Sequence, residues 1–320
     1  MRIDTKLLLI PTVLVLLLFC FACANEERGI SYPEEPYIIV LGIAQDAGFP
    51  QANCQKSCCK EVWRRPELRR MVSCIGIVDP LTNQAWMVDA TPDFKDQLKL
   101  LTEHREDGVI DLGGIFLTHA HIGHYTGLVH LGREVMGAQG IPVYAMPKMS
   151  AFLRNHGPWS QLVALENIHI DTLADNHAVA LSSGIQVTPL RVPHRDEFSE
   201  TVGYSIARGD QGILFIPDID KWEKWDRDLI AEIKRHSTVL IDGSFYANGE
   251  IPGRDMSQIP HPFVEETLAL LSDIDPEEKS KVHFIHLNHT NPLLHTESAE
   301  NQEVMRRGFY IAQEKEAFPL

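Results

Sequence analysis

The distribution of apolar and polar residues along the chain predicts a protein of alternating strands and helices. Ten short apolar runs, rich in β-branched residues and bounded by glycine, proline or charged residues, have the character of buried strands. They lie at 37–41, 74–78, 85–88, 114–118, 142–145, 185–190, 202–207, 212–216, 238–241 and 282–285. Amphipathic patterns predict helices at 93–104, 126–136, 149–156, 226–236 and 262–271.

The order of these elements favours a layered α/β architecture. Strands dominate first, strand–helix alternation follows, and the pattern then repeats, which fits an α/β/β/α sandwich of two sheets flanked by helices. Periodicity alone does not separate this arrangement from other mixed α/β folds.

The N-terminus predicts export. A basic start, MRIDTK, precedes an apolar run at 7–24 and a polar ANEERG stretch, so we interpret 1–24 as a signal peptide. Pro11 interrupts the run, which makes a permanent transmembrane helix the weaker interpretation. Ordinary cleavage after Ala24 and lipidation of Cys23, with membrane attachment as a lipoprotein, are both compatible with the sequence. We expect a periplasmic protein with a linker at 25–36 and one domain at 37–320.

Composition restricts the partners. A chain of 320 residues with 44% hydrophobic residues can bury a large core, and its formal charge of −15 repels polyanions. We therefore expect a small-molecule substrate and no nucleic acid. No feature of the sequence indicates an oligomeric state.

The cysteines outside the leader have three interpretations. Cys54, Cys58 and Cys59 are clustered, whereas Cys74 stands alone. In an exported protein they could form disulfides that involve Cys74, although adjacent cysteines do not bridge each other comfortably. A metal site built by the cluster and free thiols are the alternatives.

A histidine-rich turn follows one of the predicted strands. The run at 114–118 leads directly into His119-Ala120-His121-Ile122-Gly123-His124, and a helical pattern begins near Thr126. Residues two apart in an extended segment point the same way, so His119 and His121 can share a metal, and the bend places His124 beside them. The turn therefore predicts a metal centre.

This turn resembles the signature His-x-His-x-Asp-His of the metallo-β-lactamase superfamily, and the resemblance extends from about 37 to 292. It implies the αββα sandwich and two neighbouring metal sites. Later ligands follow predicted strands in the order that the resemblance requires. The implied first site is His119, His121 and His194, and the implied second site is His124, Asp218 and His286, with Asp218 bridging the two. Asp218 and His124 are also the expected catalytic residues.

Two further acidic residues adjoin these ligands. Asp89 closes the strand at 85–88 and is expected to orient a ligating histidine, with a helix-cap or turn role as the alternative. Asp220 is an alternative to Asp218, but the position directly at the strand end favours Asp218.

Gly123 departs from the signature. Glycine has no side chain to coordinate a metal, so the usual carboxylate of the second site is missing from the motif. We expect one or two zinc ions at this centre, with iron or manganese as alternatives. Replacing Gly123 by Asp is predicted to restore the missing ligand.

The segments LGIAQDAGFPQANC at 41–54 and HLNHTNP at 286–292 are similar to the two ends of the pyrroloquinoline quinone biosynthesis protein B family. That family has a cysteine knot after the first segment, and a related branch adds a histidine three residues after the last active-site histidine. The resemblance implies a structural zinc site of Cys54, Cys58, Cys59 and His289.

Taken together, these features predict a metal-dependent hydrolase that attacks an ester-like or phosphodiester bond with metal-bound hydroxide. Oxidative maturation or carriage of a quinone cofactor or its precursor is the alternative, and a non-catalytic binding protein is the third hypothesis. Tyr125, Arg195 and His261 are candidates for substrate contacts.

Overall fold

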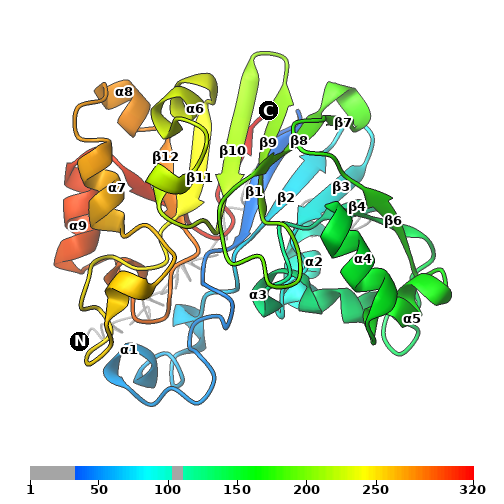
Figure 1. Cartoon of the computed structure of the whole chain (residues 1–320), viewed down its shortest axis with the longest axis horizontal. Helices are drawn as coiled ribbons and strands as arrows, with labels where there is room; N and C mark the ends of the chain where they lie inside the picture. The colour runs from blue at the N-terminus through cyan, green and yellow to red at the C-terminus, as the bar shows by residue number, and fades with distance from the viewer. Residues whose placement is uncertain (1–32, 103–110) are drawn as a thin grey trace, which may run out of the picture. The chain divides into compact units, whose positions relative to one another are not determined.

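Two mixed β-sheets pack face to face at the centre of the fold, which the computed structural model describes for residues 33–102 and 111–320 (Figure 1). The predicted signal peptide at 1–24 and most of the linker at 25–36 lie outside these residues. Within the described ranges, no helix has both the length and the apolar character needed to cross a bilayer.

The first sheet has the order β14-β1-β2-β3-β4-β5-β6. Pairs from β14 to β3 are antiparallel, whereas β3, β4, β5 and β6 run parallel to one another. The strands are β1 (Tyr37–Gly42), β2 (Cys74–Asp79), β3 (Gln84–Val88), β4 (Asp111–Phe116), β5 (Ile141–Ala145), β6 (Ile168–Thr172) and β14 (Ala317–Pro319).

The second sheet has the order β13-β12-β11-β10-β9-β8-β7. Here β10, β11, β12 and β13 are parallel, and β7, β8, β9 and β10 are joined by antiparallel pairs. The strands are β7 (Val179–Ala180), β8 (Gln186–Arg191), β9 (Val202–Arg208), β10 (Gln211–Ile216), β11 (Thr238–Asp242), β12 (Val282–Ile285) and β13 (Tyr310–Ile311).

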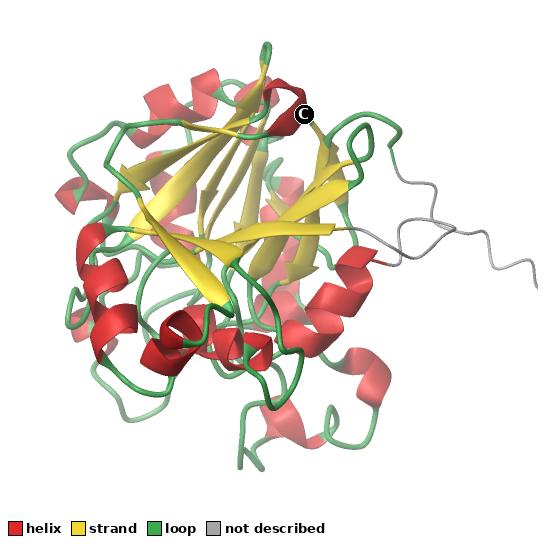
Figure 2. Cartoon of the chain, turned by 90° about the vertical axis from the view of Figure 1, so that its right-hand side faces the viewer, coloured by secondary structure: helices red, strands yellow, loops and turns green. Residues whose placement is uncertain are grey.

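Helices cover the outer face of each sheet, so the α/β/β/α arrangement is confirmed (Figure 2). Against the first sheet lie α2 (Phe94–Thr102), α3 (Ile122–Tyr125), α4 (Pro147–Asn155) and α5 (Trp159–Ala164). Against the second lie α6 (Leu229–Arg235), α7 (Val264–Leu270) and α9 (Ala299–Arg306). The short helices α1 (Ser57–Lys60) and α8 (Pro276–Lys279) belong to connecting segments.

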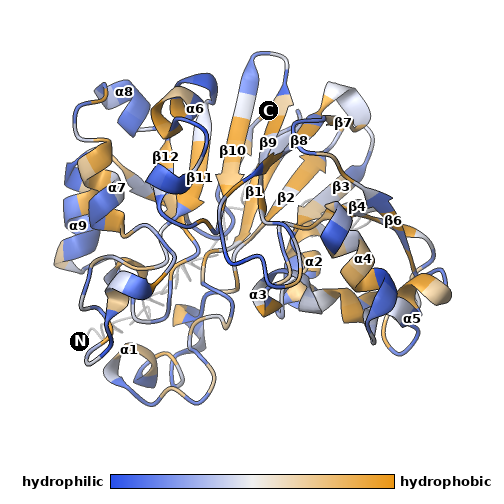
Figure 3. Ribbon diagram, viewed as in Figure 1, coloured by the Kyte–Doolittle hydropathy of each residue, from blue (hydrophilic) through white to orange (hydrophobic). Residues whose placement is uncertain are grey.

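The first strand illustrates why the sequence forms these layers. Tyr37, Ile39 and Leu41 pack against the helices of the first sheet, whereas Ile38 and Val40 pack into the core between the sheets. Side chains alternate between the faces of a strand, so a strand with both faces buried reads as one apolar run. Orange, the hydrophobic colour, dominates the middle of the central strands in Figure 3, as this double burial requires.

Each predicted strand overlaps a strand of the structure, but one helix was predicted incorrectly. Instead of a helix at 126–136, the chain forms the four-residue α3 and then a 3-10 helix, η2 (Thr126–Leu131). Gly127 explains the change, because its N–H donates to the Ala90 carbonyl at 2.8 Å and a Cβ there would lie 2.1 Å from the Thr91 carbonyl oxygen. This contact with the loop after β3 outweighs the local helical pattern.

The remaining helix predictions were correct to within a few residues, although 103 and 104 of the helix predicted at 93–104 lie outside the described residues. Several short elements were not predicted. The helix α9 buries only Asn301 and Val304, so its sequence carries almost no apolar signal.

Candidate metal centre

The six ligand candidates in and after the histidine-rich turn meet where strands of both sheets end. Open α/β sheets bind ligands outside the carboxyl ends of their parallel strands, because chain segments from several strands converge there. His119 and His121 follow β4, His124 lies in α3, His194 follows β8, Asp218 follows β10, and His286 follows β12. The topology therefore gathers residues that are far apart in the sequence.

The first cluster contains His119, His121, His194 and Asp218, and one donor atom from each lies within 4.8 Å of the others. The Oδ2 atom of Asp218 lies 3.3 Å from His119 Nε2 and 3.7 Å from His121 Nδ1. Its Oδ1 atom lies 3.2 Å from His194 Nε2. The Asp218 carboxylate thus lies next to the three imidazoles that the sequence assigned to the first site.

The second cluster contains His124, His286 and Asp46. The two Nε2 atoms of the histidines are 3.3 Å apart, and Asp46 Oδ1 lies 3.2 Å from that of His124 and 3.8 Å from that of His286. Asp218 Oδ2 is 4.0 Å from His124 Nε2, so this carboxylate borders both clusters.

Asp46 was not predicted as a site residue. It lies in the loop after β1, within the segment that carries the family resemblance, but no ligand-like spacing distinguishes it. An acidic side chain in an otherwise apolar and glycine-containing loop was the available signal.

The donors of these clusters fit a bound cation. Among the described residues, both ring nitrogens of His194, Asp218 Oδ1 and Asp46 Oδ1 are buried without a hydrogen-bond partner. Leaving a buried polar group unsatisfied costs about 1–3 kcal/mol. His194 Nε2 and Asp218 Oδ1 are 3.2 Å apart yet make no hydrogen bond, so both atoms retain lone pairs for a metal. Imidazole nitrogens with carboxylate oxygens form a donor set that suits zinc.

Asp89 orients His124. Its Oδ2 atom accepts a hydrogen bond from His124 Nδ1 at 2.6 Å, and its Oδ1 atom accepts one from the Thr118 N–H at 2.8 Å. Asp89 therefore keeps a proton on His124 Nδ1 and leaves Nε2 as the nitrogen that faces His286 and Asp46 and would bind a metal. On His286, the Ser244 hydroxyl contacts Nδ1 at 2.9 Å and leaves Nε2 in the same role.

The clusters carry strong local fields. Burial alone would raise the pKa of Asp218, but the imidazoles of His194 and His261 outweigh it and hold that pKa well below its usual value. Burial disfavours protonation of His124, yet the carboxylates of Asp89 and Asp46 raise its pKa well above the usual range. For His119, burial and the neighbouring His124 lower the pKa by more than the Asp218 carboxylate raises it, so the pKa lies well below its usual value.

The three candidates for substrate contacts lie in different surroundings. His261 is buried, with Nδ1 2.8 Å from Asp242 Oδ2 and 3.2 Å from Asp218 Oδ1. Burial would lower its pKa, but these two carboxylates raise it to about 9. His261 therefore lies beside Asp218 as a buried, charged partner, and its predicted contact with substrate stays a prediction.

Tyr125 is placed differently from the prediction. It is buried, and its ring lies 4.7 Å from that of Trp159 and 5.5 Å from that of Phe152, within the helical layer. It therefore supports the helices instead of facing the metal centre. Arg195 is half-exposed and lies 3.6 Å from Glu197, so it remains available at the edge of the centre.

The centre is open on the side of His121 and Asp46. Their side chains are 13% and 27% exposed, whereas those of His119, His124, His194, Asp218 and His286 are at most 2% exposed. Glu197 borders this opening and lies 3.1 Å from His121 Nε2. A surface cavity of about 440 Å³ lies beside Glu197 and Phe198, and another of about 360 Å³ adjoins His194.

This geometry agrees with the family comparison. The model described as the beta-lactamase superfamily domain matches residues 86–284, which contain five of the six predicted ligands together with Asp89. The chain belongs to this family.

Named relatives place the chain closer to one branch of the superfamily. It is 26% identical to coenzyme PQQ synthesis protein B of Methylorubrum extorquens over 303 residues, which cover 87% of this chain and 98% of the relative. A zinc-bound PqqB structure from Methylobacterium extorquens matches with a TM-score of 0.75 and 25% identity, covering 89% and 100%. A diphosphatase of the PhnP family shares the fold, with a TM-score of 0.59, 20% identity and coverage of 88% and 96%.

The structure changes the interpretation of Gly123, the position at which this chain departs from the superfamily signature. The sequence indicated that Gly123 leaves the second site without its motif carboxylate and that Gly123→Asp would restore one. The structure instead brings Asp46 to that site, and a Cβ on Gly123 would lie 2.3 Å from Asp46 Oδ1 and 2.5 Å from Asp46 Cα. No free space remains for a side chain at 123.

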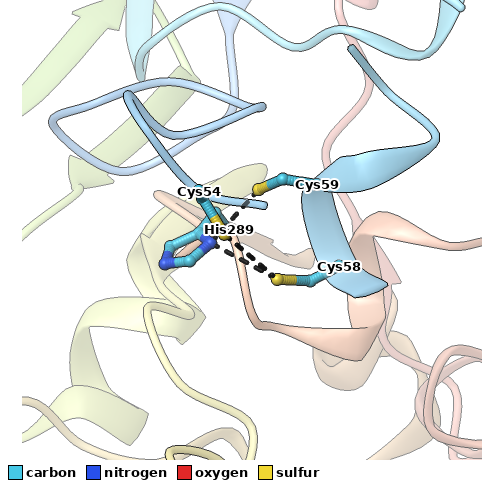
Figure 4. Close-up of side chains that lie close together, drawn as sticks. All are labelled: Cys54, Cys58, Cys59 and His289. Atoms are coloured by element: carbon cyan, nitrogen blue, oxygen red, sulfur yellow. Dashed lines mark hydrogen bonds between the residues drawn. The ribbon is translucent and has the colours of Figure 1, made fainter. Parts of the chain in front are cut away.

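The predicted structural site is assembled as well. Cys58 and Cys59 Sγ lie 3.6 and 3.3 Å from His289 Nδ1, and Cys54 Sγ lies 3.8 Å from Cys58 Sγ (Figure 4). Three sulfurs and one imidazole nitrogen match the donors of a structural zinc site. Burial raises the pKa of Cys59 to about 12, so a bound cation would be needed to hold this thiol as a thiolate.

The disulfide alternative is not found among the four described cysteines, all of which are free thiols. Cys74 is buried in β2, where its sulfur lies 3.5 Å from the Asp89 carbonyl oxygen, away from the other three. Asp220, the alternative to Asp218, pairs with Lys224 at 2.7 Å instead of joining either cluster.

Proposed function

We propose that this chain is a metal-dependent enzyme whose role is related to that of coenzyme PQQ synthesis protein B, acting on a quinone-type cofactor or its precursor. The similarity over 87% of this chain and 98% of that relative carries the proposal, because it extends far beyond the metal-binding turn. Zinc is the proposed resident metal, and iron is the alternative if the reaction is oxidative.

The chain's own residues suit this role. When bound, a divalent cation supplies Lewis acidity, and iron adds redox chemistry. His261 and Asp89 hold Asp218 and His124 in fixed orientations, so the donor set is preorganised. The buried ligands exclude water from one side, which leaves substrate to approach past His121 and Asp46.

Side chains near this opening fit a small polar aromatic molecule. Phe198 is 61% exposed beside the cavity next to Glu197 and offers a face on which a planar ring could stack. Arg195, half-exposed at the same edge, offers a guanidinium for a carboxylate group. The charge of −15 supports a small substrate over a nucleic acid.

Hydrolysis of an ester-like or phosphodiester bond is the second candidate. The position of Asp218 between the two clusters favours it, because two neighbouring cations joined by a shared carboxylate can stabilise both the attacking and the leaving oxygen.

Metal identity together with turnover separates the candidates. The purified protein is analysed for zinc and iron, then loaded with each metal and assayed for oxygen consumption with a quinone precursor and for hydrolysis of bis(p-nitrophenyl) phosphate. Oxygen-dependent conversion supports the first proposal, and phosphodiester hydrolysis without it supports the second. Tight binding of pyrroloquinoline quinone without either reaction would indicate carriage. His194→Ala is the control that should abolish metal-dependent activity in every case.

We also propose export, on the basis of the leader at 1–24. Intact-mass analysis of periplasmic and membrane fractions should find a mature chain that begins at Asn25, or at a lipidated Cys23. A cytoplasmic product that still begins at Met1 would contradict the proposal.

A further inference from the structure

Gly123 is in contact with another part of the chain at the point where the superfamily signature has an aspartate. A Cβ built there would lie 2.3 Å from Asp46 Oδ1, 2.5 Å from Asp46 Cα and 3.0 Å from Asp46 Cβ. Real Cβ atoms essentially never approach other heavy atoms within 3.0 Å. The backbone of Asp46 is one of these neighbours, so a rotation of the Asp46 side chain alone would not make room.

The Asp46 carboxylate occupies this space and faces the second cluster. Its Oδ1 atom is 3.2 Å from His124 Nε2 and 3.8 Å from His286 Nε2, and it lacks a hydrogen-bond partner within the described part of the chain. An unsatisfied carboxylate oxygen that points at two imidazole nitrogens is arranged as a metal ligand would be.

The loop that carries Asp46 is fixed to the strand end that carries His286. The Gln45 N–H donates to the Leu287 carbonyl at 2.8 Å, and the Leu287 N–H donates to the Ile43 carbonyl at 2.8 Å. These bonds join Ile43 and Gln45, in the segment that leads into Asp46, to Leu287, the residue after His286. The carboxylate is therefore held beside the second cluster by the backbone and does not depend on a flexible side chain to reach it.

We propose that Asp46 is the carboxylate ligand of the second metal site and replaces the aspartate that the signature would place at position 123. Gly123 makes this replacement possible, since only a residue without Cβ lets the Asp46 loop pack against position 123. The site keeps the donor set of one carboxylate and two imidazoles, with Asp218 nearby, although the motif itself lacks the carboxylate.

This inference concerns metal occupancy and holds for either proposed reaction. If Asp46 is a ligand, the centre holds two metal ions, although the motif alone suggests a single ion. A failure to find the proposed enzymatic activity would leave the inference intact, because its test measures zinc and not turnover.

Three variants test the exchange. Asp46→Asn removes the charge at nearly constant volume, Gly123→Asp adds the signature residue while Asp46 remains, and Asp46→Gly with Gly123→Asp transfers the carboxylate to its usual place. Asp220→Asn is the matched control, because that carboxylate lies two residues from Asp218 but pairs with Lys224. Zinc per chain is measured by elemental analysis, zinc affinity by competition with a chromophoric chelator, and folding by circular dichroism.

We expect Asp46→Asn to weaken the second zinc by at least about 100-fold, since a direct ligand should matter at least as much as the groups that orient ligands. Gly123→Asp alone should lower the melting temperature without adding zinc, because both side chains require one space. The double variant should regain wild-type stoichiometry, and Asp220→Asn should keep it.

Two results would overturn the proposal. The first is a folded Asp46→Asn protein with wild-type zinc content and affinity. The second is a folded double variant that binds zinc no better than Asp46→Asn. Should the double variant fail to fold, the cobalt-substituted proteins decide: visible absorption of Asp46→Asn identical to that of the wild type would mean that Asp46 does not ligate.

Discussion

Asp89 should control zinc affinity without touching the metal, and Asp89→Asn tests this role. In the structure its carboxylate accepts hydrogen bonds from His124 Nδ1 at 2.6 Å and from the Thr118 N–H at 2.8 Å. An asparagine has one accepting oxygen and one donating nitrogen, so it can satisfy only one of these two donors. If its oxygen faces Thr118, its NH₂ group meets His124 Nδ1, and the imidazole must move its proton to Nε2.

That proton would occupy the lone pair that His124 directs at the second cluster. In the other amide orientation His124 keeps its tautomer, but a buried N–H of Thr118 loses its acceptor, at a cost of about 1–3 kcal/mol. In either orientation, the loss of the charge-assisted hydrogen bond to His124 adds to the free-energy cost. We expect the zinc affinity of the second site to fall about 10- to 100-fold, which corresponds to about 1.4–2.8 kcal/mol.

Competition with a chromophoric chelator measures this affinity, and thermal unfolding reports stability separately. Asp79→Asn is the matched control, since Asp79 is equally buried but bonds the side chains of Thr82, Ser182 and Ser183, away from the metal centre. It should lower the melting temperature and leave zinc affinity unchanged. A folded Asp89→Asn protein whose second cluster binds zinc with wild-type affinity would refute the tautomer argument.

Three further predictions concern other parts of the molecule. His194→Ala should remove the zinc of the first cluster together with activity, because it deletes one of three imidazoles; full zinc content at that cluster by elemental analysis would contradict the assignment. Cys59→Ser should lose about one zinc per chain and lower the melting temperature, because it removes a sulfur ligand of the structural site. An unchanged zinc content would exclude a structural metal at this site. Burial raises the pKa of Glu314 from 4.5 to about 7, so its ionisation in the folded protein is unfavourable and destabilises the fold increasingly as pH rises from about 5 to 8. Glu314→Gln, which keeps an acceptor for the Met71 N–H, should therefore gain stability over the wild type across this range, by at most about 3 kcal/mol in denaturant unfolding, and a difference independent of pH would contradict the shift.

Local patterns favoured a layered α/β architecture, and the resemblance of the histidine-rich turn to the superfamily signature implied the αββα sandwich and most of the ligands. Strands buried on both faces, such as β1 and β10, read as apolar runs whatever their partners, because side chains alternate strictly between faces. The resemblance to the superfamily signature implied the ligands His194, Asp218 and His286, each of which lies one to three residues after the end of a strand. The order of strands within the sheets did not follow from these patterns, since pairing depends on contacts between distant segments.

Tertiary contacts decided what those patterns left open. The helix predicted at 126–136 became a short 3-10 turn because Gly127 packs on the loop after β3. His261, a candidate for substrate contact in the sequence, lies buried between the carboxylates of Asp218 and Asp242, a position that follows from the tertiary structure alone.

Position 123 shows most clearly what the sequence determines and what the tertiary structure adds. The sequence by itself determined that three imidazoles share one turn and that the motif lacks its carboxylate, since both are properties of adjacent residues. It did not determine where a replacement would come from. Asp46 is 77 positions before Gly123, and backbone hydrogen bonds from its loop to Leu287, Met71 and Arg70 hold its carboxylate beside His124 and His286. Ligand geometry is set by distances in space, and a sequence records only the order of the chain.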